Sequence, residues 1–305
     1  MNIEKQKIID LLVNNRPTLS QSSIKTYTSL LYNLYINIFK SLDIDLEKFK
    51  QQKKFLDYLK DYEPKRRKTY LSALYVLCPD CELYHYQMND DINESNAIGR
   101  GQKRNLKENE NWITQDELTN KLNELEQIAN PLLEQKILTN QQFQQLQNYI
   151  LLVLLSGKYF PVRRSLDYVH LKYKNYNTEN DNYINLKSRS PKIVFNIYKT
   201  ARTHGKQILH ISNELKYILN KWIKILKQKY PDSDYLFYDS EGKQLTSSKI
   251  TQRLNKIFGK KASINIIRHS FVTEKYNNMP SLNELTNNSY GMGHSLTTHL
   301  EYIKN

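Results

Sequence analysis

The sequence predicts a mainly α-helical protein with one small antiparallel β-sheet, and three observations carry that prediction. Over about the first hundred residues, apolar side chains recur three and four positions apart, which places them on one face of a helix. Between Asn182 and Ile211 the period falls to two, the period of a half-buried strand. The stretch from Asn89 to Asn111 is polar, contains Gly99 and Gly101, and has no apolar periodicity. We therefore expect two domains, residues 1–88 and 112–305, joined by a linker over residues 89–111.

The first domain is expected to contain helices whose starts and stops are marked by particular residues. Ser20 is a good N-cap for a helix that reaches about Lys40. A second helix is expected over residues 51–61. Pro64 opens a third at its first turn, where the missing N–H has no helical partner, and Pro79 limits it.

That third helix begins with a run of four basic residues, a charge that opposes the helix dipole. The run therefore has another use, such as phosphate contact, or it is a solvated surface. The linker and the turn between the last two expected strands are basic as well. The residues expected to contact phosphate are Lys65, Arg66, Arg67, Lys68, Arg100, Lys103, Arg104 and Arg202.

The overall charge agrees with a nucleic-acid partner. The chain has 45 Lys+Arg against 31 Asp+Glu, a formal charge of +14, which attracts polyanions. The alternative is a protein that is basic because its coding sequence is AT-rich. No stretch approaches about 18 apolar residues, and the N-terminus lacks the form of a signal peptide, so no membrane partner and no secretion are expected.

The only two cysteines, Cys78 and Cys81, form a Cys-x-x-Cys pair. Such a pair can be redox-active or supply half of a zinc site, but no second pair exists. The plainer interpretation is that Pro79 stops a helix and two thiols lie at its end. So few cysteines suit a reducing, intracellular setting, in the nucleus or the cytoplasm.

The second domain is expected to start at Thr114, where Thr114 and Glu117 form a capping box. Helices follow to about Asn130 and over residues 140–156. Three short strands are expected at residues 183–187, 192–198 and 206–211. Helices resume over residues 212–229 and 247–258, and a further helix carries Arg268.

The C-terminal residues suit attack on a phosphodiester by a phenol. Arg268 offers a rigid fork for two phosphate oxygens, and His294 can donate a hydrogen bond or move a proton. Tyr302 can become covalently attached to its substrate. With 23 tyrosines in the chain, the alternative is that Tyr302 is a packing aromatic.

With these residues in this order, the chain resembles the tyrosine recombinase (integrase) family, which shares its chemistry with type IB topoisomerases. The resemblance rests on Arg268-His269-Ser270-Phe271 and on Gly293-His294-Ser295 through Tyr302. It implies a clamp around duplex DNA, formed by a helical core-binding domain and an α+β catalytic domain. It also implies a mobile-element or viral integrase that works as a dimer or tetramer on DNA.

The resemblance carries further site residues onto this chain. The family's first arginine has an acid three residues on, which selects Arg164 with Asp167, and Arg163 is the second choice. The family's hairpin lysine falls on Lys199, with Lys206 as the weaker candidate.

The chain departs from the family pattern at three places. The family usually has His three residues before its second arginine, and this chain has Asn265, which cannot take a proton. Proton handling is then expected from Lys199 and His294, with His269, beside Arg268, as the weaker candidate. His294 and Tyr302 are eight residues apart, where the family usually shows about nine. Family members often continue with a docking helix past this chain's last residue, so assembly uses other contacts or the chain is shortened.

The implied reaction is cleavage and rejoining of DNA through a 3′-phosphotyrosine, without a metal, ATP or another cofactor. Arg164 and Arg268 stabilise the phosphate charge, Lys199 protonates the leaving oxygen, and His294 hydrogen-bonds the phosphate. Two alternatives stay open: a topoisomerase-like relaxing enzyme, and a decayed, non-catalytic DNA-binding protein.

Overall fold

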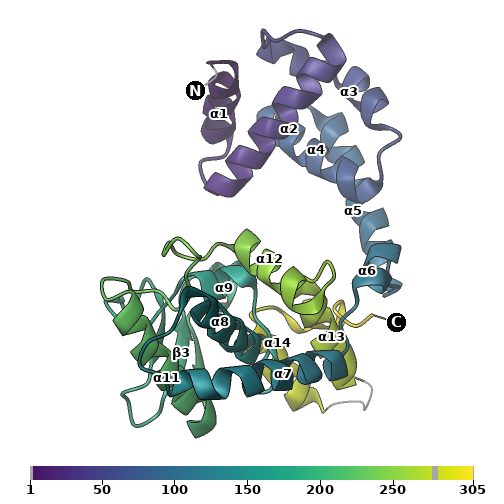
Figure 1. Ribbon diagram of the computed structural model, residues 1–305. Coiled ribbons are helices and arrows are strands. Elements are labelled where there is room, and N and C mark those ends of the chain that lie inside the picture. Colours follow the sequence, from purple (N-terminus) through teal and green to yellow (C-terminus); the bar gives the residue numbers. More distant parts are fainter. Residues whose placement is uncertain (1–2, 277–280, 305) are drawn as a thin grey trace. The chain divides into compact units, whose positions relative to one another are not determined.

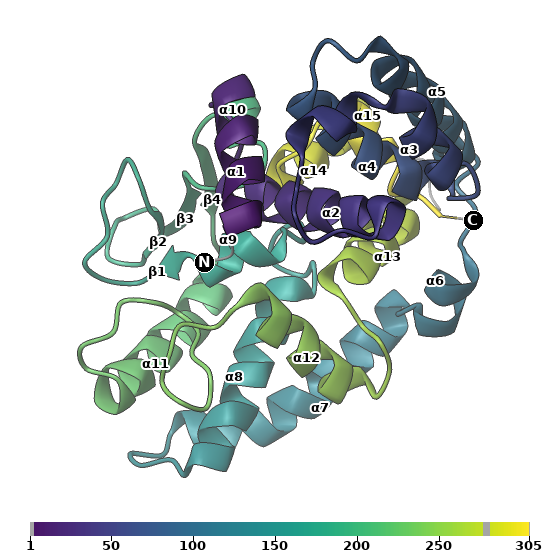
Figure 2. The same cartoon turned by 90° about the horizontal axis from the view of Figure 1, so that it is seen from above.

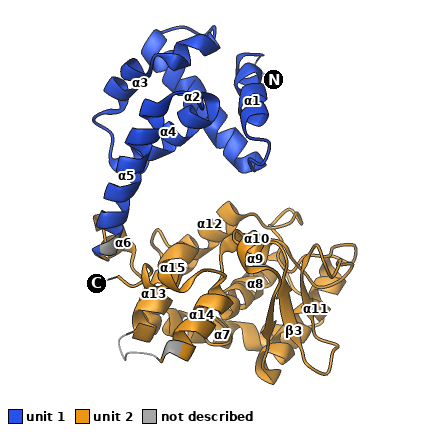
Figure 3. Ribbon diagram, turned by 180° about the vertical axis from the view of Figure 1, so that it is seen from behind, with its two compact units in different colours: residues 1–101 blue, residues 102–305 orange. Residues whose placement is uncertain are grey.

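The computed structural model describes residues 3–276 and 281–304. The chain divides into two compact units, residues 1–101 and 102–305, shown in Figure 3. Each unit has its own hydrophobic core. In the part of the chain that the structure describes, we find no helix with the length and apolar character needed to span a bilayer.

Unit 1 consists of helices (Figure 1). The three helices expected from the sequence are confirmed: Ser20 caps the second helix through the Ser23 N–H, and Pro64 opens the fourth. The first and fifth helices were not anticipated individually. The helices are α1 (Ile3–Asn15), α2 (Gln21–Phe39), α3 (Gln52–Leu59), α4 (Pro64–Leu77) and α5 (Glu82–Arg100), with a 3-10 turn at Leu46–Lys50.

The two cysteines lie between α4 and α5 as buried free thiols. Burial raises the pKa of Cys78 to about 12, which keeps that thiol protonated and unreactive. The plain interpretation of the Cys-x-x-Cys pair therefore agrees with the structure.

Much of the expected linker over residues 89–111 is helical. Residues 89–100 continue α5 and belong to unit 1, and α6 (Leu106–Asn111) follows within unit 2. The apolar pattern is weak in this part of α5 because a buried ion pair attaches it to α4: Arg67 contacts the fully buried carboxylate of Asp91 at 2.6 Å.

Unit 2 has a helical body and one sheet (Figure 2). Its long helix α8 is buried on nearly every side, and α7 packs along it. The elements are α7 (Gln115–Leu133), α8 (Asn140–Leu155), α9 (Ser165–Val169), β1 (Leu171–Lys172), β2 (Asn182–Asn185), β3 (Lys192–Phe195), α10 (Ala201–His204), β4 (Gln207–His210), α11 (Asn213–Lys229), α12 (Ser247–Phe258), α13 (Ile264–Tyr276), α14 (Leu282–Met292) and α15 (Leu296–Leu300).

The sheet is mixed and has four strands in the order β1-β2-β3-β4. The three expected strands form the antiparallel part, with Ile193 opposite both Ile184 and Leu209. β1 pairs with β2 in parallel, and this corrects the expectation of a purely antiparallel sheet. A strand of two residues is too short to show a period of two in the sequence.

The start of α7 differs in one detail from the expected capping box. Thr114 accepts from the Glu117 N–H as predicted. The Glu117 carboxylate, however, accepts from Lys260 at 2.7 Å. The charged Lys260 ammonium forms a stronger hydrogen bond with the Glu117 carboxylate than the Thr114 backbone N–H would.

Candidate active site

Arg268 lies at the centre of the candidate site and is fully buried on α13. One guanidinium nitrogen donates to the Val162 carbonyl at 3.0 Å, and the other contacts His294 Nδ1 at 3.1 Å. Burial lowers the pKa of Arg268, and interaction with the Tyr302 side chain opposes that shift. The guanidinium thus has a carbonyl oxygen and an imidazole nitrogen as acceptors, and neither of these two acceptors carries a negative charge.

Tyr302 lies beside this arginine. Its ring centroid is 5.0 Å from the Arg268 guanidinium carbon and 5.1 Å from the His294 ring. The His269 ring stacks on Tyr302 at 4.5 Å, and its Nδ1 donates to the Tyr302 carbonyl at 2.9 Å. Arg268, His294 and Tyr302 therefore meet in one place, with Arg268 on α13 and the other two residues after the end of α14.

Hydrogen bonds to backbone groups hold the segment that carries Tyr302 in unit 2. Gln102 donates to the Leu300 carbonyl at 2.8 Å, and the Lys304 N–H donates to Thr273 Oγ1 at 3.0 Å. Arg104 reaches the Lys304 carbonyl at 3.3 Å while its guanidinium lies 3.9 Å from the Trp112 ring. The phenol is thus placed beside Arg268 within the same chain.

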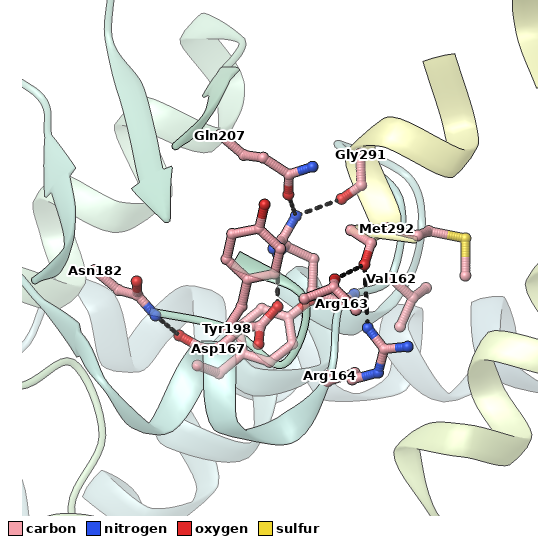
Figure 4. A network of polar contacts seen from close by, with 12 residues as sticks. Val162, Arg163, Arg164, Asp167, Asn182, Tyr198, Gln207, Gly291 and Met292 are labelled. Carbon is pink, nitrogen blue, oxygen red and sulfur yellow. Dashed lines mark hydrogen bonds and ion pairs between the residues drawn. The ribbon is translucent and has the colours of Figure 1, made fainter. Parts of the chain in front are cut away.

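The two neighbouring arginines at the start of α9 have different environments. Arg163 is fully buried and pairs with Asp167 at 2.8 Å, and Figure 4 shows it between Asp167 and Gln207. It also donates to the Gly291 carbonyl at 2.8 Å. These contacts fix Arg163 in the framework between α9, β4 and α14.

Arg164 is only partly buried and lies at the N-cap position of α9. It donates to the Gly293 carbonyl at 3.3 Å, a long hydrogen bond. Its charge is close enough to contribute to lowering the pKa values of Arg268 and His294. Arg164 therefore has a weakly engaged guanidinium next to Arg268, whereas Arg163 has its charge balanced by Asp167.

Two glycines allow α14 to approach these arginines. Gly293 ends α14 in the left-handed region at φ 69°, and a Cβ there would lie 3.1 Å from Arg163. At Gly291, a Cβ would lie 2.8 Å from Pro161. Neither position leaves room for a side chain.

Of the two candidate lysines, Lys199 is exposed in the turn that precedes α10. The next residue, Thr200, donates its hydroxyl to the Gly293 carbonyl, which ties the turn to the site. Lys206 donates to the Thr178 carbonyl at 3.1 Å and pairs with Glu179 at 3.2 Å. Lys199 keeps its ammonium unpaired among the described residues, and Lys206 does not.

His294 is buried with both ring nitrogens occupied, by Arg268 at Nδ1 and by His299 Nδ1 at Nε2, 2.8 Å away. Burial lowers the pKa of His294 to about 2, and the nearby charges of Arg268, His299 and Arg164 act in the same direction. The ring is therefore neutral at physiological pH. It has no free nitrogen for a phosphate, and it is poorly suited to the proton transfer that the sequence analysis assigned to it.

His299 was missed by the sequence analysis. It lies in the segment between His294 and Tyr302, which was considered only for its length. No sequence signal marks it, because the residue becomes notable only through its contact with His294. Asn265 is exposed on the first turn of α13, three residues before Arg268.

The basic residues assigned to phosphate contact differ in their exposure. Lys65 and Arg66 are exposed on α4, and Lys103 and Arg202 are exposed in unit 2. Lys68 is partly buried and reaches Ser95 at 3.3 Å.

Arg67 and Arg104 are engaged inside the protein, by Asp91 and by Trp112 with Lys304 respectively. The sequence does not show this, because Asp91 is 24 residues from Arg67 and Lys304 is 200 residues from Arg104. The side chain of Arg100 lies outside the described residues. Within residues 3–276 and 281–304, no group of three or more His, Cys, Asp or Glu side chains is placed to hold a metal ion.

The fold is that of the tyrosine recombinases and integrases, the class that the C-terminal residues resemble. Among solved structures, the chain is similar to XerH site-specific recombinase bound to palindromic difH substrate, with a TM-score of 0.57 and 17% identity. That similarity covers 92% of this chain and 75% of the other. The chain is also similar to the Tn1549 transposon integrase in complex with transposon right end DNA, with a TM-score of 0.53, 15% identity, and 98% and 95% of the two chains covered. No family model and no curated protein sequence matches it.

Proposed function

We propose that this protein is a DNA strand-transfer enzyme, a site-specific recombinase or integrase that acts through Tyr302. The observation that carries the proposal is the meeting of Tyr302 with Arg268, whose guanidinium carbon is 5.0 Å from the phenol ring. The fold supports it, since both similar structures are of a recombinase or an integrase with DNA. Mobile-element or viral origin is part of the same proposal.

In the proposed reaction, the Tyr302 oxygen forms a bond to a DNA phosphorus and the bond to the 5′ oxygen breaks. The phenol proton passes to solvent water, and the departing 5′ oxygen takes a proton from the Lys199 ammonium. The product is a 3′-phosphotyrosine and a free 5′-hydroxyl, and the reverse reaction rejoins a strand without ATP. Arg164 and Arg268 stabilise charge on the non-bridging oxygens, a contribution of about 3–4 kcal/mol for each such donor.

His294 has a different role here from the one expected from the sequence. With Nδ1 accepting from Arg268, it orients the guanidinium that meets the phosphate. Proton transfer to the leaving oxygen is then assigned to Lys199 alone.

Exposed basic side chains supply the contacts to the DNA backbone in this proposal. The exposed ones are Lys65 and Arg66 in unit 1, and Lys103 and Arg202 in unit 2, and the partly buried Lys68 is proposed to join them. Arg67 is left out because its charge is balanced by Asp91, and Arg104 because it packs on Trp112. A dimer or tetramer on DNA remains part of the proposal.

The test is covalent trapping on a nicked duplex. After cleavage, the short fragment that carries the free 5′-hydroxyl diffuses away, so the strand cannot be rejoined. The wild type should form a protein–DNA adduct, and Tyr302→Phe should bind the DNA and form none. Tyr217→Phe, an exposed tyrosine on α11, is the matched control and should form adduct as the wild type does. An undiminished adduct in Tyr302→Phe would show that another residue is the nucleophile.

Two further outcomes separate the alternatives. Relaxation of supercoiled plasmid lacking any recognition site would indicate a topoisomerase-like enzyme. DNA binding with no adduct from the wild type under any substrate tested would indicate a non-catalytic binding protein.

A further inference from the structure

His299 is a buried titratable residue that the proposed chemistry does not use. It lies on α15 with 1% of its surface exposed. Its Nδ1 is 2.8 Å from His294 Nε2, and its backbone carbonyl accepts from the Tyr302 N–H at 3.1 Å. Its ring also meets the Tyr276 ring edge-on at 5.5 Å. His299 thus contacts the residue that holds Arg268 and the residue proposed as nucleophile.

The positions of the ring protons follow from the partners. A guanidinium can only donate, so His294 Nδ1 must accept from Arg268. A neutral His294 ring then carries its proton on Nε2, and His299 Nδ1 must accept it. A neutral His299 carries its own proton on Nε2, which is buried and has no hydrogen-bond partner among the described residues.

This arrangement differs from the way Arg163 is held. Arg163 pairs with the carboxylate of Asp167, so its positive charge is already balanced. Arg268 is held at one nitrogen by an uncharged imidazole instead. An uncharged acceptor fixes the direction of the guanidinium and leaves its charge for an anionic substrate, whereas a carboxylate would compete with that substrate. Two neutral rings in series achieve this only if each is held in the correct tautomer.

We propose that His299 is a positioning residue for strand transfer: it accepts a hydrogen bond from His294 and thereby fixes the ring that orients Arg268. This inference rests on the proposed function for its effect on the reaction, but the arrangement of the two rings is a property of the free protein.

The first experiment compares His299→Leu with His299→Asn in single-turnover adduct formation at saturating DNA. Leucine removes the acceptor and leaves the His294 N–H buried without a partner, so adduct formation should slow about tenfold with unchanged DNA affinity. The Asn side-chain oxygen can replace the Nδ1 acceptor, so His299→Asn should react at a rate closer to the wild type. His210→Leu, at an exposed position on β4, is the control and should react normally.

Equal slowing by leucine and asparagine, or no slowing by leucine, would overturn the proposal, because a space-filling role does not depend on an acceptor. If His299→Leu fails to fold, the asparagine variant and the following measurement still decide.

The second experiment reads the tautomers directly in the free wild-type protein. Long-range proton–nitrogen NMR spectra distinguish a protonated ring nitrogen from an unprotonated one. Both His294 and His299 should be neutral with the proton on Nε2 at pH 7, and a proton on Nδ1 of either would refute the proposal. Because this measurement needs no cleavage, a wild type that forms no adduct would count against the proposed function while leaving the role of His299 decidable.

Discussion

Arg163 and Asp167 form an ion pair 2.8 Å long with both side chains almost completely buried, one turn apart at the start of α9. Arg163 also donates to Gln207 on β4 and to the Gly291 carbonyl on α14. The ion pair therefore belongs to a network of contacts that links α9, β4 and α14. Breaking a buried pair leaves an unbalanced charge, which is far more destabilising than losing an exposed pair.

Asp167→Ala should therefore lower the free energy of unfolding by about 3–5 kcal/mol. The matched control is Glu241→Ala, which removes an exposed partner of Lys243 and should change the free energy of unfolding far less. Urea unfolding of both variants measures the difference. Similar values for the two would contradict the assignment of Arg163 to the framework.

Gly293→Ala should destabilise the protein more than Gly259→Ala. Both glycines lie in the left-handed region, at φ 69° and 65°, so both substitutions carry the same backbone strain. Only at Gly293 would the new Cβ meet neighbours, with Arg163 at 3.1 Å and Gln207 at 3.3 Å. We expect about 1 kcal/mol at Gly259 and about 1–3 kcal/mol more at Gly293, measured by denaturant unfolding.

Lys199→Ala should reduce cleavage by about 10²–10⁴-fold, the usual contribution of a general acid, and Lys206→Ala should have little effect. Lys206 is already paired with Glu179, whereas Lys199 is exposed in the turn whose Thr200 contacts Gly293. A substrate with sulfur in place of the 5′ bridging oxygen has a leaving group that needs no proton. It should restore cleavage by Lys199→Ala, and failure to restore it would argue against a general acid.

Arg67→Ala should lower stability, whereas Lys65→Ala should lower DNA affinity. Arg67 is 2.6 Å from Asp91, whose carboxylate would be left buried and unpaired, while Lys65 is exposed on the same helix. Loss of one phosphate contact should reduce the slope of log affinity against log salt by about 0.9. Thermal melting and DNA titration at several salt concentrations separate the two effects. If a folded Arg67→Ala variant shows a reduced salt slope, Arg67 contacts a DNA phosphate and its exclusion here is wrong.

Stability should fall as the pH is lowered from about 6.5 towards 4 because of the two buried histidines. Burial lowers the pKa of His299 to about 4 and that of His294 to about 2. Since both pKa values are below that of an unfolded histidine, the unfolded chain binds more protons in this range, and acid favours unfolding. Each histidine can contribute up to about 1.4 kcal/mol per pH unit.

His299→Asn removes one of these titrations, so its free energy of unfolding should fall less steeply between pH 6.5 and 4.5 than that of the wild type. His210→Asn, at an exposed site, is the control. An unchanged slope in His299→Asn would mean that His299 is not held neutral by the fold.

The helices and their ends could be predicted from sequence because the signals are local. Ser20 and Pro64 fix where α2 and α4 begin through groups within a few residues of themselves. The order Arg268, His294, Tyr302 likewise indicated a shared site, and the structure places the three side chains together.

Tertiary structure alone decided how those side chains are engaged. Arg163 and Arg164 are adjacent in sequence, yet packing gives one a buried carboxylate and leaves the other partly exposed. In the same way, packing brings Arg67 to Asp91 and His299 to His294. Periodicity and capping report the conformation of a few consecutive residues, whereas hydrogen bonds between side chains depend on which elements pack together, and that information is not local.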